Sequence, residues 1–157
     1  GLKDSATETQ IWTLWAIGTI GDPEAASEVV GKLRSDDPAV RKMAVYVLGA
    51  LKDPSTIRDL QVALNDSVAD VRWNAAMALA QMNDAAGADL LIQLIDREYL
   101  GQFPDMSLAE KDNAIVNAVK CLRRLKLEGA KDEITSLSQS DPSLVVRNAA
   151  LEALNTY

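Results

Sequence analysis

The sequence predicts an all-α fold in which helix pairs are stacked into an array. A pattern of apolar and small residues returns at 31-residue steps, for example from Arg41 to Arg72. Within each copy the apolar residues recur at steps of three and four, which is the spacing of one helix face. No segment shows the alternation typical of a β-strand. A period of this length indicates a repeat array, in which each unit buries its apolar face against its neighbours.

Five copies of the pattern set the expected organisation of the chain. They begin at Gln10, Arg41, Arg72, Asp112 and Arg147, and the fourth copy arrives about nine residues late. We therefore expect one domain over residues 1–157, with about five helix pairs. The approximate units are residues 8–34, 35–65, 66–96, 107–139 and 140–157, with an insertion at about 97–106.

Each unit divides into a shorter and a longer helical stretch. The longer stretch of the third copy has one apolar face, formed by Val71, Ala75, Ala78, Leu79 and Met82. The shorter stretches carry matching apolar sets: Ala26, Val29 and Leu33; Ile57, Leu60 and Leu64; Ala88, Leu91 and Ile95. Asp-Pro pairs at 22–23, 37–38, 53–54 and 141–142 separate the stretches, because Asp caps a helix that Pro can begin. Ser107 and Glu110 form a capping box that opens the helix after the insertion.

Composition excludes several classes of function. The chain has 48% hydrophobic and 25% charged residues and a net charge of −7, which is spread over both halves. Such a field repels nucleic acid and anionic lipid, so we expect neither as a partner. No apolar run approaches the roughly 20 residues that span a bilayer.

The composition also disfavours catalysis and metal binding. The chain has no histidine, which excludes Ser-His-Asp and Cys-His arrangements and nearly all zinc or di-iron sites. The single cysteine, Cys121, lies in an apolar helix and is expected to be a buried, unreactive thiol. We expect no catalysis, no cofactor and no bound metal.

The repeated residues resemble those of a known family of helical repeats. The run Arg-x-x-Ala-Ala-x-Ala-Leu, which follows Asp-Pro-x-Val and closes near Leu48 to Pro54, resembles the HEAT-like repeats of the phycobilisome-lyase type. The resemblance is strongest over residues 36–96 and weakest in the first and fourth copies, where Gln10 and Asp112 replace the arginine. It implies a right-handed α–α superhelix of the HEAT-like or armadillo type, with the second helices lining the concave face. It also implies protein–protein scaffolding.

Two enzymes are related to this type of repeat, but neither activity carries over. Deoxyhypusine hydroxylase depends on His-Glu iron motifs, for which this chain has no histidine. Bilin lyase subunits also use such repeats, yet no residue here marks a bilin pocket.

One set of charged residues is expected to form a structural ladder between the turns. Arg41, Arg72 and Arg147 share one position near the start of the longer helices. The aspartates of the adjacent turns are Asp36, Asp37, Asp66, Asp70 and Asp141. Because equivalent residues of a stack are close in space, each arginine is expected to bond turn aspartates. An anion site built from these arginines is the alternative.

A second set lies opposite the apolar face and predicts a partner-binding stripe. On a helical wheel the outward positions of the first three copies are large and mostly aromatic or apolar. They are Ile11, Trp12, Trp15, Lys42, Tyr46, Trp73 and Met77. A row of small residues, Gly18, Gly49 and Ala80, is expected to form the floor of a groove beside them. Exposed aromatics are enriched at binding hot spots, although residues 1–8 or a preceding repeat could cover the stripe instead.

The function that these patterns predict is a non-catalytic scaffold that binds a protein or peptide along its concave helix face. The alternatives are a regulatory or chromophore-handling subunit of an enzyme and a structural segment of a longer solenoid. The insertion, with Tyr99, Leu100 and Phe103, is expected to plug a gap between units rather than to bear function. We expect a monomer or weak oligomer in the cytoplasm, with the periplasm as the alternative if a signal peptide has been removed.

Overall fold

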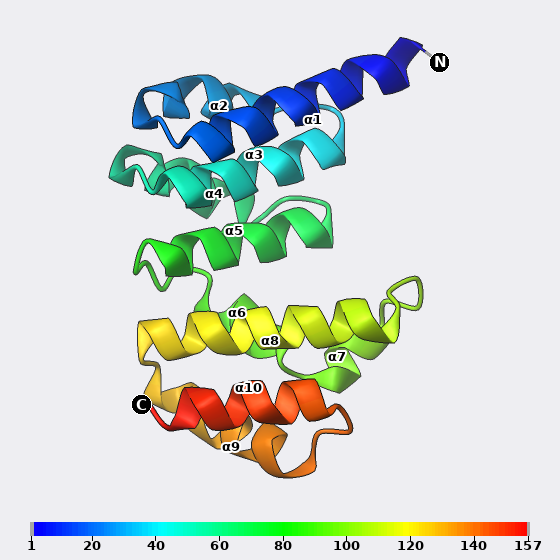
Figure 1. Ribbon diagram of the computed structural model, residues 1–157, viewed down its shortest axis with the longest axis vertical. Coiled ribbons are helices and arrows are strands. Elements are labelled where there is room, and N and C mark those ends of the chain that lie inside the picture. The colour runs from blue at the N-terminus through cyan, green and yellow to red at the C-terminus, as the bar shows by residue number, and fades with distance from the viewer. Residues whose placement is uncertain (1, 157) are drawn as a thin grey trace. The chain divides into compact units, whose positions relative to one another are not determined.

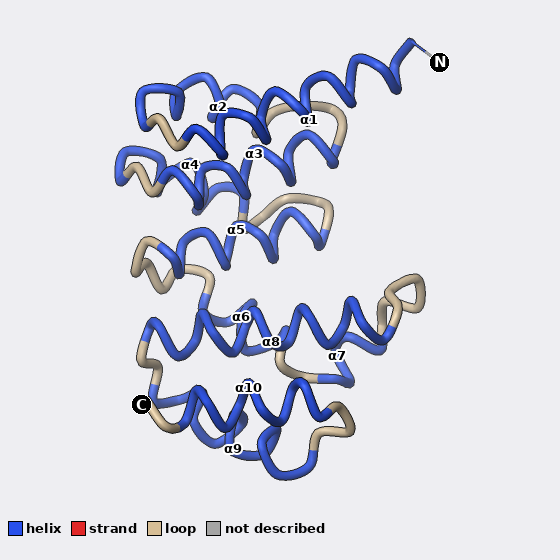
Figure 2. Tube along the Cα trace, viewed as in Figure 1, coloured by secondary structure: helices blue, strands red, loops and turns tan. Residues whose placement is uncertain are grey.

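The computed structural model describes residues 2–156, with side chains from Ser5 onward. All regular structure in this part of the chain is helical (Figures 1 and 2). The chain divides into two compact units, Gly1–Gly87 (unit 1) and Ala88–Tyr157 (unit 2). The all-α, HEAT-like solenoid class predicted from the repeat is confirmed.

Within the described residues, unit 1 contains five α-helices. The longer ones are α1 (Leu2–Ile20), α3 (Pro38–Leu51) and α5 (Ala69–Gln81), and the shorter ones are α2 (Ala26–Lys32) and α4 (Ile57–Ala63). Short 3₁₀ turns at Pro23–Ala25 and Pro54–Thr56 lead into α2 and α4. The longer helices lie side by side as one layer, α1 against α3 and α3 against α5, and α2 and α4 lie behind it (Figure 1).

Unit 2 repeats this arrangement with one addition. Its elements are α6 (Ala88–Leu94), α7 (Arg97–Gly101), α8 (Leu108–Leu125), the 3₁₀ turn Glu128–Ala130, α9 (Lys131–Ser140) and α10 (Leu144–Leu154). Helices α8 and α10 pack side by side. Helix α6 packs on α8, and α9 packs on α10. Helix α7 lies within the predicted insertion, which is therefore not an irregular loop.

The helix starts follow from the capping residues. The carboxylates of Asp22, Asp37 and Asp53 each accept a hydrogen bond from the backbone N–H two residues on, and a proline follows each of them. The capping box at the start of α8 is confirmed: Glu110 N–H donates to Ser107 Oγ at 3.2 Å, and Ser107 N–H donates to Glu110 Oε2 at 2.7 Å. Local sequence thus sets where these helices begin.

Packing defines the helix pairs differently from the sequence units. Helix α2 packs mainly on α3, and α4 packs mainly on α5, so each short helix belongs with the longer helix that follows it. The buried core of unit 1 lies between these layers and includes Leu14, Val29, Leu48, Leu60 and Leu79. In this pairing α1 is a second helix that no short helix precedes within the described residues.

Candidate functional site

The outward face of α1, α3 and α5 carries a stripe of three large side chains in one register. Trp15 is 51% exposed, Tyr46 is 58% exposed and Met77 is half-buried. We call Trp15, Tyr46 and Met77 the outward stripe. Large, exposed and partly apolar side chains of this kind are costly on a free surface and favourable in an interface.

Two neighbours of the outward stripe belong to α1. Trp12 is 66% exposed and packs edge-to-face on Trp15, with ring centroids 6.0 Å apart and an angle of 81° between the rings. Ile11 is half-buried at the edge of the stripe. On α3, Lys42 Nζ lies 2.8 Å from Asp70 Oδ2, and both side chains are 48% exposed. The stripe therefore has an aromatic end on α1 and one exposed ion pair beside it.

Trp73 does not belong to this surface, so the expectation that it is exposed was wrong. Its exposed fraction is 5%, although it occupies the same position in the repeat as Ile11 and Lys42. The helical wheel assumed that α5 buries only one face. Instead α5 is apolar almost all round, with Val71, Ala75, Ala76, Ala78, Leu79 and Ala80 also buried, and such a helix is covered on several sides.

The row of small residues is not the floor of a groove. A Cβ at Gly18 would lie 3.1 Å from Val47 Cγ2, and a Cβ at Gly49 would lie 2.8 Å from Ala78 Cβ. At Gly18 α1 therefore lies close against α3, and at Gly49 α3 lies close against α5. Ala80, the third member, is fully buried. Small side chains are present at these positions because they allow the stacked helices to pack at short distance.

The alternative that residues 1–8 cover the stripe is also wrong for residues 2–8, which the structure describes. Residues 2–8 continue the axis of α1 as regular helix and do not fold back over the layer (Figure 1). Gly1 lies outside the described residues. A helix that runs on without a turn cannot return over its own outward face.

The arginine ladder is present, and its main aspartate is Asp66, one of the turn aspartates expected to bond the arginines. Arg41 donates from Nε to Asp66 Oδ2 at 2.8 Å and from Nη2 to Asp66 Oδ1 at 2.9 Å, while its Nη1 donates to Ser35 O at 2.8 Å. This fork joins the turn before α3 to the turn before α5. The hydrogen bond from Arg41 holds the pKa of Asp66 below its usual value, and Asp66 in turn raises the pKa of Arg41.

Arg72 and Arg147 repeat the contact that Arg41 makes with the backbone of the turn before its own helix. Arg72 Nη1 donates to the carbonyl oxygen of Asp66 at 2.8 Å, and Arg147 Nη1 donates to that of Asp141. Each therefore ties the start of its helix to the residue six positions earlier. These guanidinium groups point into the turns, so they do not form an open anion site.

Asp37 and Asp70 have partners that the spacing did not predict. Asp37 accepts hydrogen bonds from Ala39 N at 2.8 Å and from Thr7 Oγ1 at 2.9 Å, and these lower its pKa. Asp70 pairs with Lys42. The spacing of six residues, which Asp66–Arg72 and Asp141–Arg147 share, is the signal that separates a ladder aspartate from its neighbours.

The insertion supplies a guanidinium that the fourth copy lacks. Asp112 occupies the position of Arg41 and Arg72. Arg97, at the start of α7, bonds Asp112 Oδ1 at 2.6 Å and forks onto Asp141 at 2.7 and 2.8 Å. Arg97 thus bridges to the turn aspartate of the last copy as Arg41 bridges to Asp66. Sequence reasoning missed this arginine, and the only signal for it was the exchange of Arg for Asp at position 112.

The rest of the insertion is part of unit 2. Leu100 is fully buried, and the rings of Tyr99 and Phe103 meet edge-to-face with centroids 5.5 Å apart. That the insertion plugs a gap between repeats stays a prediction.

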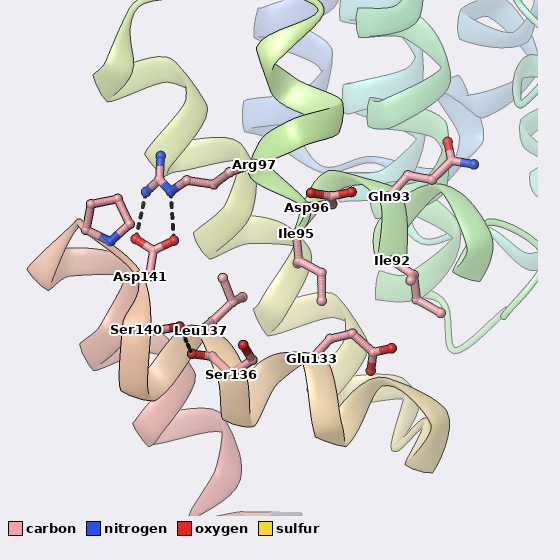
Figure 3. A pocket seen from close by; sticks show the side chains of 11 residues that line it. Ile92, Gln93, Ile95, Asp96, Arg97, Glu133, Ser136, Leu137, Ser140 and Asp141 are labelled. Carbon is pink, nitrogen blue, oxygen red and sulfur yellow. Dashed lines mark hydrogen bonds and ion pairs between the residues drawn. The ribbon is translucent and has the colours of Figure 1, made fainter.

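A depression of about 560 Å³ lies between the start of α7 and α9 in unit 2. Figure 3 shows Ile95 and Leu137 pointing into it and the Arg97–Asp141 fork closing one side. Because Arg97 is already engaged by two carboxylates, this depression offers an arriving anion no unpaired guanidinium. Its chemistry is that of an apolar hollow with a polar rim.

Reactive groups are scarce within the described residues. Cys121 is buried, and burial raises the pKa of its thiol to about 11, so little thiolate forms near neutral pH. No group of three or more acidic, cysteine or histidine side chains that could hold a metal ion occurs in the part of the chain the structure describes. None of the described helices is long and apolar enough to cross a bilayer.

Comparisons with known proteins agree with this geometry. The family model for HEAT repeats matches residues 1–69 and, in a second placement, residues 32–100. A chain in the structure of the complex of CpcE and CpcF of phycocyanin lyase from Nostoc sp. PCC7120 is similar, with a TM-score of 0.70 and 21% sequence identity. The match covers 93% of this chain and 58% of that one, so this chain spans little more than half the length of its structural relative. A search of curated protein sequences finds no match.

Proposed function

This chain belongs to the HEAT repeat family, and we propose that it is a non-catalytic scaffold that binds a protein or peptide across the outward face of α1, α3 and α5. The single observation that carries the proposal is the exposure of Trp15 and Tyr46, at 51% and 58%, in one register of neighbouring helices. Both side chains project from rigid helices, which lowers the entropy cost of binding.

The energy available at this surface suits a specific interface. Burying the exposed half of each ring removes roughly 100 Å² from water, which contributes about 2–3 kcal/mol per ring at 25 cal/mol per Å². The Lys42–Asp70 pair beside the stripe is exposed and contributes little to affinity, but it can fix the orientation of a partner. Large central aromatics with a polar edge are the arrangement found at binding hot spots.

The test compares a double variant with a matched control. The immobilised 157-residue chain captures proteins from its source cells, and each captured protein is then purified and its affinity is measured directly. Trp15→Ala/Tyr46→Ala should weaken binding by more than about tenfold, because two anchors are lost. Val62→Ala, which truncates a 74%-exposed side chain on α4, should bind like the unaltered chain. Equal binding by the double variant would rule out the outward stripe as the site.

The second candidate is a chromophore-handling subunit of an enzyme. It is favoured by the likeness to a chain of the phycocyanin lyase complex, although 21% identity carries the fold alone. The two candidates predict different spectra: a chromophore-handling subunit mixed with a free bilin should shift the visible absorbance of the pigment. An unchanged bilin spectrum at high protein concentration would remove this candidate and leave the scaffold unaffected.

A further inference from the structure

The depression in unit 2 is a groove with one closed end. Its first wall is formed by the end of α6 and the start of α7, and its second wall by α9. The Arg97–Asp141 fork closes one end, and Glu133 lies toward the other (Figure 3). We call this depression the α6–α9 groove. A further repeat would stack beyond α9 and α10 and not between α6 and α9, so the groove is not an end face of the array.

The length of the α6–α9 groove fits a short extended segment. The α9 residues that line it run from Glu133 to Ser140, which is roughly 10 Å at a rise of 1.5 Å per residue. About three residues of extended chain, at roughly 3.3 Å each, span that length. The volume of about 560 Å³ lies within the range of ligand-binding clefts. Alternate side chains of an extended segment point the same way, so two of them can enter the groove together.

The floor of the groove is apolar. Ile95 and Leu137 point into it and are only 4% and 9% exposed, and Ile92 is half-buried beside them. An apolar side chain that contacts this floor leaves water, which favours binding. The serine hydroxyl of this wall is already satisfied, since Ser140 Oγ donates to Ser136 O at 2.9 Å. The floor therefore favours an apolar group and requires no polar one.

The rim of the groove is negatively charged. The ionisable side chains that line it are Asp96, Arg97, Glu133 and Asp141. Arg97 is held by Asp141 and Asp112, so it does not neutralise the other two carboxylates. Within the described residues Glu133 forms no hydrogen bond or ion pair, and Asp96 accepts only one hydrogen bond, from a backbone N–H of α7 at 2.8 Å. The rim thus carries two exposed carboxylates that no described cation pairs with.

We propose that the α6–α9 groove binds an extended segment of a partner protein in which a lysine or arginine lies two positions from an apolar residue. The apolar side chain contacts Ile95 and Leu137, and the cationic side chain reaches the carboxylates of Asp96 and Glu133. Complementary charge selects this occupant, because the two carboxylates attract a basic segment and repel an acidic one. The groove lies in unit 2 and the outward stripe in unit 1, so failure of one proposal leaves the other unaffected.

The test is an NMR titration of the isotope-labelled 157-residue chain with the peptide acetyl-Ser-Lys-Ser-Leu-Ser-amide. The backbone amides of residues 92–97 and 133–141 should shift and saturate at millimolar peptide, since so short a segment makes few contacts. Asp96→Asn/Glu133→Gln should weaken binding at least about fivefold, because two exposed ion pairs are lost while Asn still caps α7. Glu24→Gln/Asp59→Asn is the matched control. It removes the same charge from a hollow between α2 and α4 of unit 1 and should bind like the unaltered chain.

Two altered peptides test the charge and the spacing separately. A peptide with glutamate in place of lysine should leave the same amides unshifted. The peptide acetyl-Ser-Lys-Leu-Ser-Ser-amide, whose lysine and leucine point in opposite directions when extended, should bind at least about threefold more weakly. Absence of shifts at tens of millimolar peptide, shifts confined to other helices, or equal losses in the two double variants would overturn the proposal.

Discussion

Arg97 and Asp141 form a two-pronged ion pair across 44 residues of sequence, with Nε–Oδ2 at 2.7 Å and Nη2–Oδ1 at 2.8 Å. The Asp141 side chain is only 2% exposed, while Arg97 is 24% exposed. Arg97 also bonds Asp112, whose partial burial raises its pKa but is outweighed by hydrogen bonds from Ser143 and Arg97, so that the net pKa is lowered. One guanidinium from the insertion thus holds two carboxylates of unit 2.

Replacing Arg97 should destabilise unit 2 selectively. Arg97→Ala leaves the buried carboxylate of Asp141 without its cation, which we expect to cost roughly 2–4 kcal/mol after allowing for the partial exposure of Arg97. Hydrogen exchange followed by mass spectrometry should show faster exchange in α9 and α10. Arg97→Lys should recover only part of the protection, because an ammonium cannot form the fork. Arg58→Ala, at an exposed arginine, is the control, and equal protection in both alanine variants would contradict this account.

The Arg41–Asp66 fork should make stability depend on pH in the acid range. The pKa of Asp66 is lowered in the folded chain, chiefly by the hydrogen bond from Arg41. Its contribution is therefore complete above the unfolded pKa of about 4 and is lost as the pH falls through the lower folded value. Denaturant titrations at pH 7 and pH 3 should show a smaller loss of unfolding free energy for Asp66→Asn than for the unaltered chain. Asp105→Asn, at an exposed carboxyl, should leave the loss unchanged.

The two glycines of unit 1 that lie in helices α2 and α3 should respond oppositely to alanine. In Gly49→Ala the new Cβ would meet Ala78 at 2.8 and 3.0 Å, so α3 and α5 must separate, at about 1–3 kcal/mol. Around Gly31 nothing lies within 4 Å, so Gly31→Ala should stabilise α2 by up to about 1 kcal/mol. Melting temperatures measured by circular dichroism should move in opposite directions. A stabilised Gly49→Ala variant would show that the helices have room to adjust.

The tryptophans should separate into surface and core residues. Trp73→Ala removes a side chain that is 5% exposed and should cost about 3–5 kcal/mol of unfolding free energy. Trp15→Ala, at 51% exposure, should change stability by less than about 1 kcal/mol. Urea titrations of the two variants provide the comparison. If Trp15→Ala unfolds as readily as Trp73→Ala, the outward stripe belongs to the core and the proposed binding surface is lost with it.

The sequence by itself determined the features that depend on local spacing. The 31-residue step, the apolar faces of the helices and the capping residues at Asp22, Asp37, Asp53 and Ser107 could all be predicted, because helix geometry and capping act within a few residues. The stacked all-α fold follows from that repetition.

Only the tertiary structure decided which residues at equivalent repeat positions share the same exposure and the same kind of ion-pair partner. Ile11, Lys42 and Trp73 share one place in the repeat, yet they are half-buried, exposed and buried, because burial depends on what covers each helix. Asp141 takes its arginine from 44 residues away, since the insertion carries Arg97 to the place that Asp112 leaves without a cation. Side-chain period is a property of one helix, whereas exposure and ion pairing are set by the neighbours that stacking brings together.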